Sequence, residues 1–160
     1  MFKYVSTKKR FFRFALFFGL IIWIFGILSL CLDLNFLLRY YPFQKLFYSN
    51  VCHQNAEKSF FCRNAPLLVC ARCLGIYLGA LFSASILILW NHPYILKTRF
   101  LILFSIPMLL DVTLLTLNIY NYNKILSSIT GFLFGSAVFV YILGGIENLL
   151  FTEKKKTNDK

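Results

Sequence analysis

Four stretches of this chain are long and apolar enough to cross a lipid bilayer, and this feature restricts the possible folds more than any other. A membrane-spanning helix needs about 20 mostly apolar residues. Inside a bilayer, backbone polar groups must also be satisfied within the helix itself. The spans are predicted at about residues 14–32, 70–90, 100–118 and 125–147. We therefore predict an all-α integral membrane bundle of four transmembrane helices, with residues 1–160 forming a single membrane domain.

The composition excludes the other broad classes. Hydrophobic residues make up 59% of the chain and charged residues only 14%, whereas soluble domains are about half apolar and about a quarter charged. The same values exclude intrinsic disorder. Five cysteines in 160 residues are too few for a small disulfide scaffold.

The first span is predicted to stay as an anchor. A cleaved signal peptide has an apolar region of about 7–15 residues that ends in small residues. The run Phe14–Leu32 is longer, and Leu30 stands where a lipoprotein signal would have a small residue before Cys31. A cleaved lipoprotein leader is the weaker interpretation.

The net charge of +11 is placed at the ends of the spans. With the N-terminus inside, the inner segments hold 11 Lys and Arg and the outer segments hold 6. This bias predicts a multi-pass protein of the cell inner (cytoplasmic) membrane with both termini cytoplasmic. The basic tail, 151–160, would lie inside and a motif loop, 33–69, outside. Its residues 36–48 mix aromatic rings with isolated cations and are predicted to lie at the membrane interface.

The predicted partners follow from the same charge pattern. They are the lipid bilayer and anionic headgroups at the basic termini. A nucleic-acid partner is not predicted, because no polar segment carries a basic groove with interleaved aromatic residues. The sequence makes no prediction about protein partners, oligomeric state, substrate or enzymatic activity.

The residues that could bind a metal or undergo redox chemistry are concentrated in one segment. Four of the five cysteines, Cys52, Cys62, Cys70 and Cys73, fall within 22 positions beside His53. Cys70 and Cys73 have the i, i+3 spacing that places two side chains on one face of a helix. The remaining cysteine, Cys31, is predicted to be a small core residue at the end of the first span.

Three interpretations of this cluster stay open. In the first, Cys70 and Cys73 hold zinc or another transition metal together with Cys52 and either His53 or Cys62, since zinc accepts four Cys, or three Cys and one His, tetrahedrally. In the second, Cys70 and Cys73 form a redox pair whose thiolates are favoured by Arg72, with Cys52 and Cys62 as a shuttle pair. In the third, disulfides merely staple the loop to the second span.

The second interpretation is similar in outline to two families of four-span thiol oxidoreductases. These are disulfide bond formation protein B and the vitamin K epoxide reductases, which pass electrons to a quinone. The similarity covers only the number of spans and the paired cysteines, so it is an analogy. Quinone is therefore the alternative cofactor to a metal.

The motif residues also resemble a known family. The residues are Cys52-His53-Gln54, Lys58-Ser59-Phe60 and the run Cys70-Ala71-Arg72-Cys73-Leu74-Gly75-Ile76-Tyr77-Leu78-Gly79, followed by Asp111 and Thr130-Gly131. They resemble the prokaryotic membrane family called domain of unknown function 2085. The resemblance implies a membrane architecture and marks five supporting residues, Gln54, Lys58, Ser59, Arg72 and Asp111. Lys58 and Leu74 depart from its usual Arg and Thr, and Cys62 is not part of its pattern.

Two further features predict contacts inside the bundle. Asp111 is an acid within an apolar run, so it should face a partner rather than lipid. We expect it to pair with the 52–79 motif or with Thr130, as a metal ligand, a proton carrier, a counter-ion of Arg72 or a packing residue. The spacings Gly75-Gly79 and Gly131-Gly135 predict close helix packing. Glu147, by contrast, is predicted to face headgroups or Lys97.

The leading hypothesis joins these observations. It is a small polytopic membrane protein with a Cys/His metal site, formed by Cys52, His53, Cys70 and Cys73, at the outer membrane surface.

Overall fold

The computed structural model describes residues 2–31, 39–62, 65–89 and 97–157, and four of its helices are long and apolar enough to cross a membrane. These are α1 (Phe2–Ile27), α4 (Ala71–Leu89), α5 (Thr98–Thr116) and α6 (Lys124–Thr157). The all-α membrane fold predicted from the sequence is confirmed.

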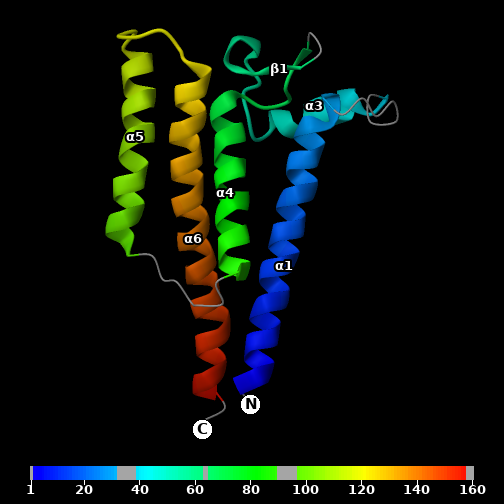
Figure 1. Cartoon of the computed structure of the whole chain (residues 1–160), viewed down its shortest axis with the longest axis vertical. Coiled ribbons are helices and arrows are strands. Elements are labelled where there is room, and N and C mark those ends of the chain that lie inside the picture. Colours follow the sequence, from blue (N-terminus) through cyan, green and yellow to red (C-terminus); the bar gives the residue numbers. More distant parts are fainter. Residues whose placement is uncertain (1, 32–38, 63–64, 90–96, 158–160) are drawn as a thin grey trace.

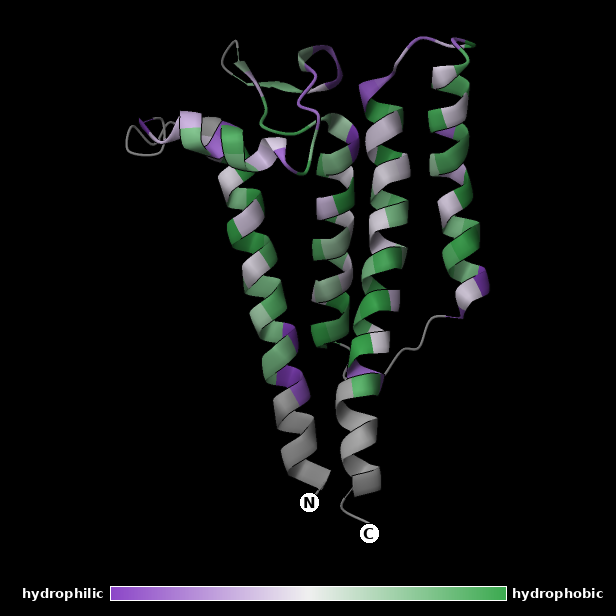
Figure 2. Ribbon diagram, turned by 180° about the vertical axis from the view of Figure 1, so that it is seen from behind, coloured by the Kyte–Doolittle hydropathy of each residue, from purple (hydrophilic) through white to green (hydrophobic). Residues whose placement is uncertain are grey.

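The four long helices run side by side in the order α1, α4, α6, α5 (Figure 1). The start of α1 and the end of α6 lie at one end of the molecule. The segment between α1 and α4 lies at the other end. Figure 2 shows apolar residues along the helices, with hydrophilic residues gathered in that segment, in the connection between α5 and α6 and near the lower ends of α1 and α6.

The helix boundaries differ from the predicted spans mainly at the ends. Helix α1 ends at Ile27 and passes into a 3₁₀ turn, η1 (Leu28–Leu30), so the first helix is shorter at this end than its apolar run. At the other end of the chain, α6 continues into the basic tail as far as Thr157. Residues 33–38 and 63–64 of the predicted loop and 158–160 of the predicted tail lie outside the described residues, as do the last residues, 32 and 90, of the first two predicted spans.

The predicted outer loop contains its own small elements. They are the helix α3 (Tyr41–Ser49), the 3₁₀ turn η2 (Ala56–Lys58) and two short strands, β1 (Phe61–Cys62) and β2 (Ala65–Pro66). The strands pair antiparallel, with Phe61 opposite Pro66 and Cys62 opposite Ala65. Proline in the first turn of α3 has the fixed φ that a helix start requires.

Helix α3 lies across the end of α1 and is joined to it by side chains (Figure 1). The buried Tyr48 hydroxyl donates a 2.9 Å hydrogen bond to the carbonyl of Trp23, and the Ser29 hydroxyl donates to Gln44 Oε1 at 3.0 Å. The opposite face of α3 exposes Phe43 and other large apolar residues. This amphipathic pattern agrees with an interface-lying helix, whose membrane position stays a prediction.

The core sits beneath α3 and the strand pair, against the adjoining ends of α1 and α4. Its buried residues are Ile27, Tyr48, Cys52, Leu67, Leu68, Val69 and Leu74. Further along the helices, α4 and α6 approach each other at their glycines. A Cβ on Gly75 would overlap the carbonyl of Ser128, and one on Gly135 would overlap that of Ile76. The predicted close packing at the glycine pairs is confirmed.

A buried ion pair corrects the prediction for Glu147. Its carboxylate accepts two hydrogen bonds from the Arg13 guanidinium, at 2.6 and 2.8 Å, and both residues are buried. Arg13 also donates to the carbonyl of Leu87 at 2.8 Å. Glu147 therefore faces neither headgroups nor Lys97, because α1 and α6 both pack against α4 and this brings Arg13 within its reach.

Candidate metal centre

Three cysteine side chains meet where α4 begins. The sulfurs of Cys52, Cys70 and Cys73 all lie within 4.8 Å of one another. Cys70 directly precedes α4 and Cys73 lies in its first turn, so helical geometry directs both to one side. Cys52 comes from the segment after α3 and is buried, whereas the other two are half-buried. The predicted convergence of these sulfurs is confirmed, and the three cysteines could hold a metal ion.

The loop that supplies Cys52 is fixed by backbone bonds and apolar packing. The Cys52 amide donates to the carbonyl of Tyr48 at 3.0 Å, which ties it to the last turn of α3. The Cys70 amide donates to Cys52 Sγ at 3.2 Å. Cys52 also belongs to the buried core cluster. The site is therefore organised by the fold before any ligand binds.

Contacts among the three sulfurs shift the pKa of Cys52 and the pKa of Cys70 in opposite directions. Hydrogen bonds from Cys70 and Cys73 lower the pKa of Cys52 well below its usual value. The same contact with Cys52 raises the pKa of Cys70. The arrangement thus favours a thiolate at Cys52, and the thiolate is the form of cysteine that binds metals and acts as a nucleophile.

His53 is not brought into the cluster. Its side chain is exposed, and among the residues that the structure describes only the three cysteines form the group of close ligand atoms. Cys52 occupies the buried position of this adjacent pair, which leaves His53 toward the outside. The described residues thus supply three sulfur ligands and no nitrogen ligand.

A disulfide between Cys31 and Cys62 corrects two further expectations. Cys31 is not simply a small core residue, and Cys62 is not the shuttle partner of Cys52. The chain turns after α1, so that Cys31 meets the strand β1 with a Cα–Cα distance of 5.6 Å to Cys62. This disulfide is separate from the group of three free thiols.

The supporting residues of the motif mainly hold the loop together. The Gln54 side-chain amide donates to the carbonyl of Lys45 at 2.8 Å, which links the loop to α3. The fully buried Ser59 donates to the carbonyl of Asn55 at 2.9 Å. The ammonium of Lys58 lies 5.6 Å from the centre of the Tyr122 ring, a cation–π contact with the connection between α5 and α6.

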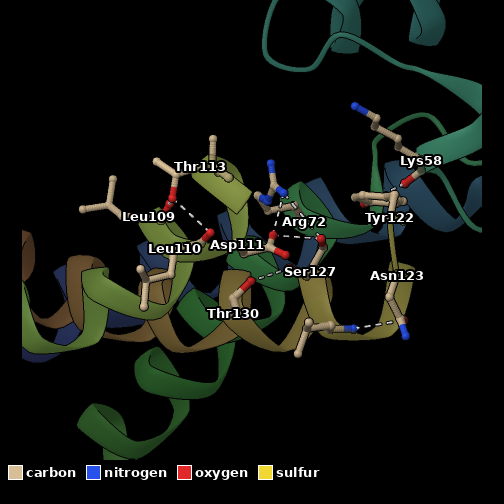
Figure 3. Close-up of polar contacts among 12 residues, drawn as sticks. Lys58, Arg72, Leu109, Leu110, Asp111, Thr113, Tyr122, Asn123, Ser127 and Thr130 are labelled. Carbon is tan, nitrogen blue, oxygen red and sulfur yellow. Dashed lines mark hydrogen bonds and ion pairs between the residues drawn. The ribbon is translucent and has the colours of Figure 1, made fainter. Parts of the chain in front are cut away.

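Asp111 points into the bundle, as predicted. It is 4% exposed, and its Oδ2 accepts a 2.6 Å charged hydrogen bond from Arg72 and a 2.9 Å bond from the Ser127 hydroxyl. Figure 3 shows these side chains directed toward one another from α4, α5 and α6. Thr130 instead donates to the carbonyl of Ser127 at 3.2 Å. Of the partners considered from the sequence, Arg72 is the one present.

Two partners of Asp111 were not predicted from the sequence. One is Ser127, which is fully buried in α6. The other is Tyr120, whose hydroxyl donates a hydrogen bond to Asp111 Oδ1. Hydrogen bonding to this carboxylate raises the pKa of Tyr120. The polar run between α5 and α6 was the available signal for Tyr120, whereas one serine in an apolar helix gave none.

The structure contradicts one part of the redox alternative. Its pair Cys70 and Cys73 lies close to Cys52, but Cys62 is bonded elsewhere. The described residues give no support for quinone, the alternative cofactor.

Comparison with known proteins agrees with the motif and the architecture. A family model described as a predicted membrane protein (DUF2085) matches residues 52–141, which include the three free cysteines, Asp111 and much of α6. An uncharacterised protein from Methanocaldococcus jannaschii is 38% identical over 104 residues. The match covers 60% of this chain and 64% of that relative, which is less than two thirds of its length. No solved structure shows a significant match.

Proposed function

This chain belongs to the family of predicted membrane proteins called domain of unknown function 2085, and on that premise we propose that it binds a transition metal at the outer membrane surface. The convergence of the Cys52, Cys70 and Cys73 sulfurs carries the proposal. Zinc binds thiolates tetrahedrally, and soft thiolate ligands also suit Cu(I). Three cysteines would leave one tetrahedral position for another ligand.

The state of the five cysteines supports a metal over simple stapling. Disulfides are typical of oxidising compartments, and Cys31 and Cys62 are paired while three other thiols within 4.8 Å of one another are free. A bound metal would keep such neighbouring thiols from oxidising, because each sulfur would be held as a metal thiolate.

Purified protein should contain about one metal ion per chain, together with one disulfide. Elemental analysis would measure the metal. Thiol titration of the denatured protein, with and without a chelator, would count the free cysteines, of which we expect three. Cys70→Ser should lose the metal because it removes one of the three sulfur ligands.

The matched control is the double variant Cys31→Ser with Cys62→Ser, which removes two sulfurs without touching the proposed site. It should keep the metal. Metal-free native protein, or equal metal loss in the control, would contradict the proposal.

Thiol–disulfide exchange is the second candidate, and one observation favours it. The lowered pKa of Cys52 provides a thiolate beside two thiols. An oxidoreductase would be isolated metal-free, with a disulfide between two of the three cysteines that exchanges with added dithiols. The same thiol count therefore separates the two candidates.

We also propose that the protein lies in the inner membrane with both termini in the cytoplasm. The 11-to-6 division of cations supports this orientation, and the disulfide at Cys31 agrees with an outer location of the motif. A cysteine introduced into the tail, 151–160, should resist a membrane-impermeant maleimide in intact cells and react after lysis. Labelling of the tail in intact cells would contradict the proposed orientation and place the tail outside.

A further inference from the structure

Helix α5 directs one buried side chain into the protein, and that side chain is a carboxylate. Among the described residues of α5, Asp111 alone is buried. The rest of this helix is largely exposed, and its large apolar side chains include Ile102, Leu103 and Leu109. A buried acid at membrane depth is costly unless it meets a partner. Asp111 therefore depends on the partners that it meets on the other helices.

The partner of this acid belongs to the thiol motif itself. Arg72 stands between Cys70 and Cys73, and its guanidinium reaches Asp111 Oδ2 at 2.6 Å. Ser127 of α6 donates to the same oxygen at 2.9 Å. Figure 3 shows the carboxylate between the Arg72 side chain and α6. One carboxylate therefore joins α5 and α6 to the first turn of α4.

This contact restrains how the first turn of α4 is rotated. Successive residues in a helix are turned by about 100°, so Arg72 leaves the helix on a different side from Cys70 and Cys73. The backbone of the same turn is held against α6, where a Cβ on Gly131 would overlap the Arg72 carbonyl. A rotation that released Arg72 from Asp111 would swing both thiols away from Cys52.

We propose that Asp111 is a positioning residue for the thiol site. Through Arg72 it fixes the rotation of the first turn of α4, so that Cys70 and Cys73 face Cys52. The proposal deepens the metal-binding function and rests on it. It assigns the acid no contact with the metal, because the carboxylate is engaged by Arg72, Ser127 and Tyr120.

The test uses Co²⁺ as a spectroscopic probe of the full-length protein in detergent. Thiolate-to-cobalt charge-transfer absorption reports how many sulfurs bind, and titration gives the Kd. Asp111→Asn keeps the size of the side chain but removes the charge that holds Arg72. We expect it to raise the Kd by about 10- to 100-fold, the range typical when a group that orients metal ligands is lost. The charge-transfer absorption should weaken as well.

Glu147→Gln is the matched control, because it removes the anion of the other buried ion pair. That pair lies near Leu87 at the end of α4, whereas the thiols lie at its start. It should lower the thermal midpoint but leave the cobalt Kd and spectrum unchanged. An Asp111→Asn protein with the wild-type Kd and spectrum would overturn the inference. Equal changes in both variants would also overturn it, since they would indicate general destabilisation.

Two further measurements keep the inference testable. If Asp111→Asn does not fold, Arg72→Gln replaces it, because it removes the cation that pairs with Asp111, and a folded Arg72→Gln protein with wild-type cobalt binding would overturn the inference. If the wild type binds no Co²⁺, the metal function fails, and thiol spacing is measured with phenylarsine oxide, which bridges neighbouring thiols. Slower bridging in Asp111→Asn than in Glu147→Gln would support the positioning role, and equal rates would end it.

Discussion

Replacement of Gly75 or Gly135 by leucine is expected to abolish the packing of α4 on α6. At each glycine the neighbouring helix presents a backbone carbonyl, from Ser128 and Ile76 respectively, in the space that a Cβ would occupy. Overpacking a core costs about 1–3 kcal/mol when side chains can shift. A backbone carbonyl cannot move without displacing its helix. We therefore expect the free energy of unfolding to fall by an amount at the upper end of this range or above it.

The thermal midpoint of the purified protein would measure the effect, followed by circular dichroism in detergent. Gly145→Leu is the matched control for Gly135→Leu, because it lies in the same helix and a Cβ added there would meet nothing within 4 Å. It should keep the wild-type midpoint. Equal midpoints for the Gly135 and Gly145 variants would mean that the close approach of α4 and α6 does not support the fold.

The spans could be predicted from the sequence because their physical cause is local. An uncharged apolar run of about 20 residues has few alternatives in a bilayer. The ends of the helices were less predictable, since apolar character does not mark where a chain leaves the helical conformation. Ile27 is followed by residues that are mostly apolar, yet α1 ends there and passes into the 3₁₀ turn η1.

The candidate site was predictable in part for similar reasons. Helical spacing brought Cys70 and Cys73 together, and comparable depth in two consecutive spans, which both pack on α6, brought Asp111 near Arg72. The bond between Cys31 and Cys62 depends on β1 lying beside the end of α1, which no local pattern encodes. The same limit applies to His53, because the sequence does not show which of two adjacent side chains faces the core.

The ion pair of Arg13 and Glu147 shows the same limit, because its partners are 134 positions apart in the sequence. Both stand near the ends of apolar runs, where a charge ordinarily faces headgroups. Only the packing of α1 and of α6 against α4 brings them together and buries them. Charged residues at the ends of apolar runs, which orient the spans in the membrane, can therefore also form a buried contact between helices.

Glu147→Leu is expected to be strongly destabilising because it leaves the buried Arg13 guanidinium without its anion. Breaking a buried ion pair by removing one partner costs about 3–5 kcal/mol. The double variant, with Arg13→Met added, should recover part of the lost stability, since an apolar pair needs no counter-charge. Recovery should stay incomplete, because Arg13 also donates to the Leu87 carbonyl. This is one of the last carbonyls of α4 and has no partner in its own helix.

Thermal midpoints should therefore rank wild type above the double variant and the double variant above Glu147→Leu. A single variant as stable as the wild type would show that the contact contributes nothing, and full recovery in the double variant would show that the bond to Leu87 is dispensable.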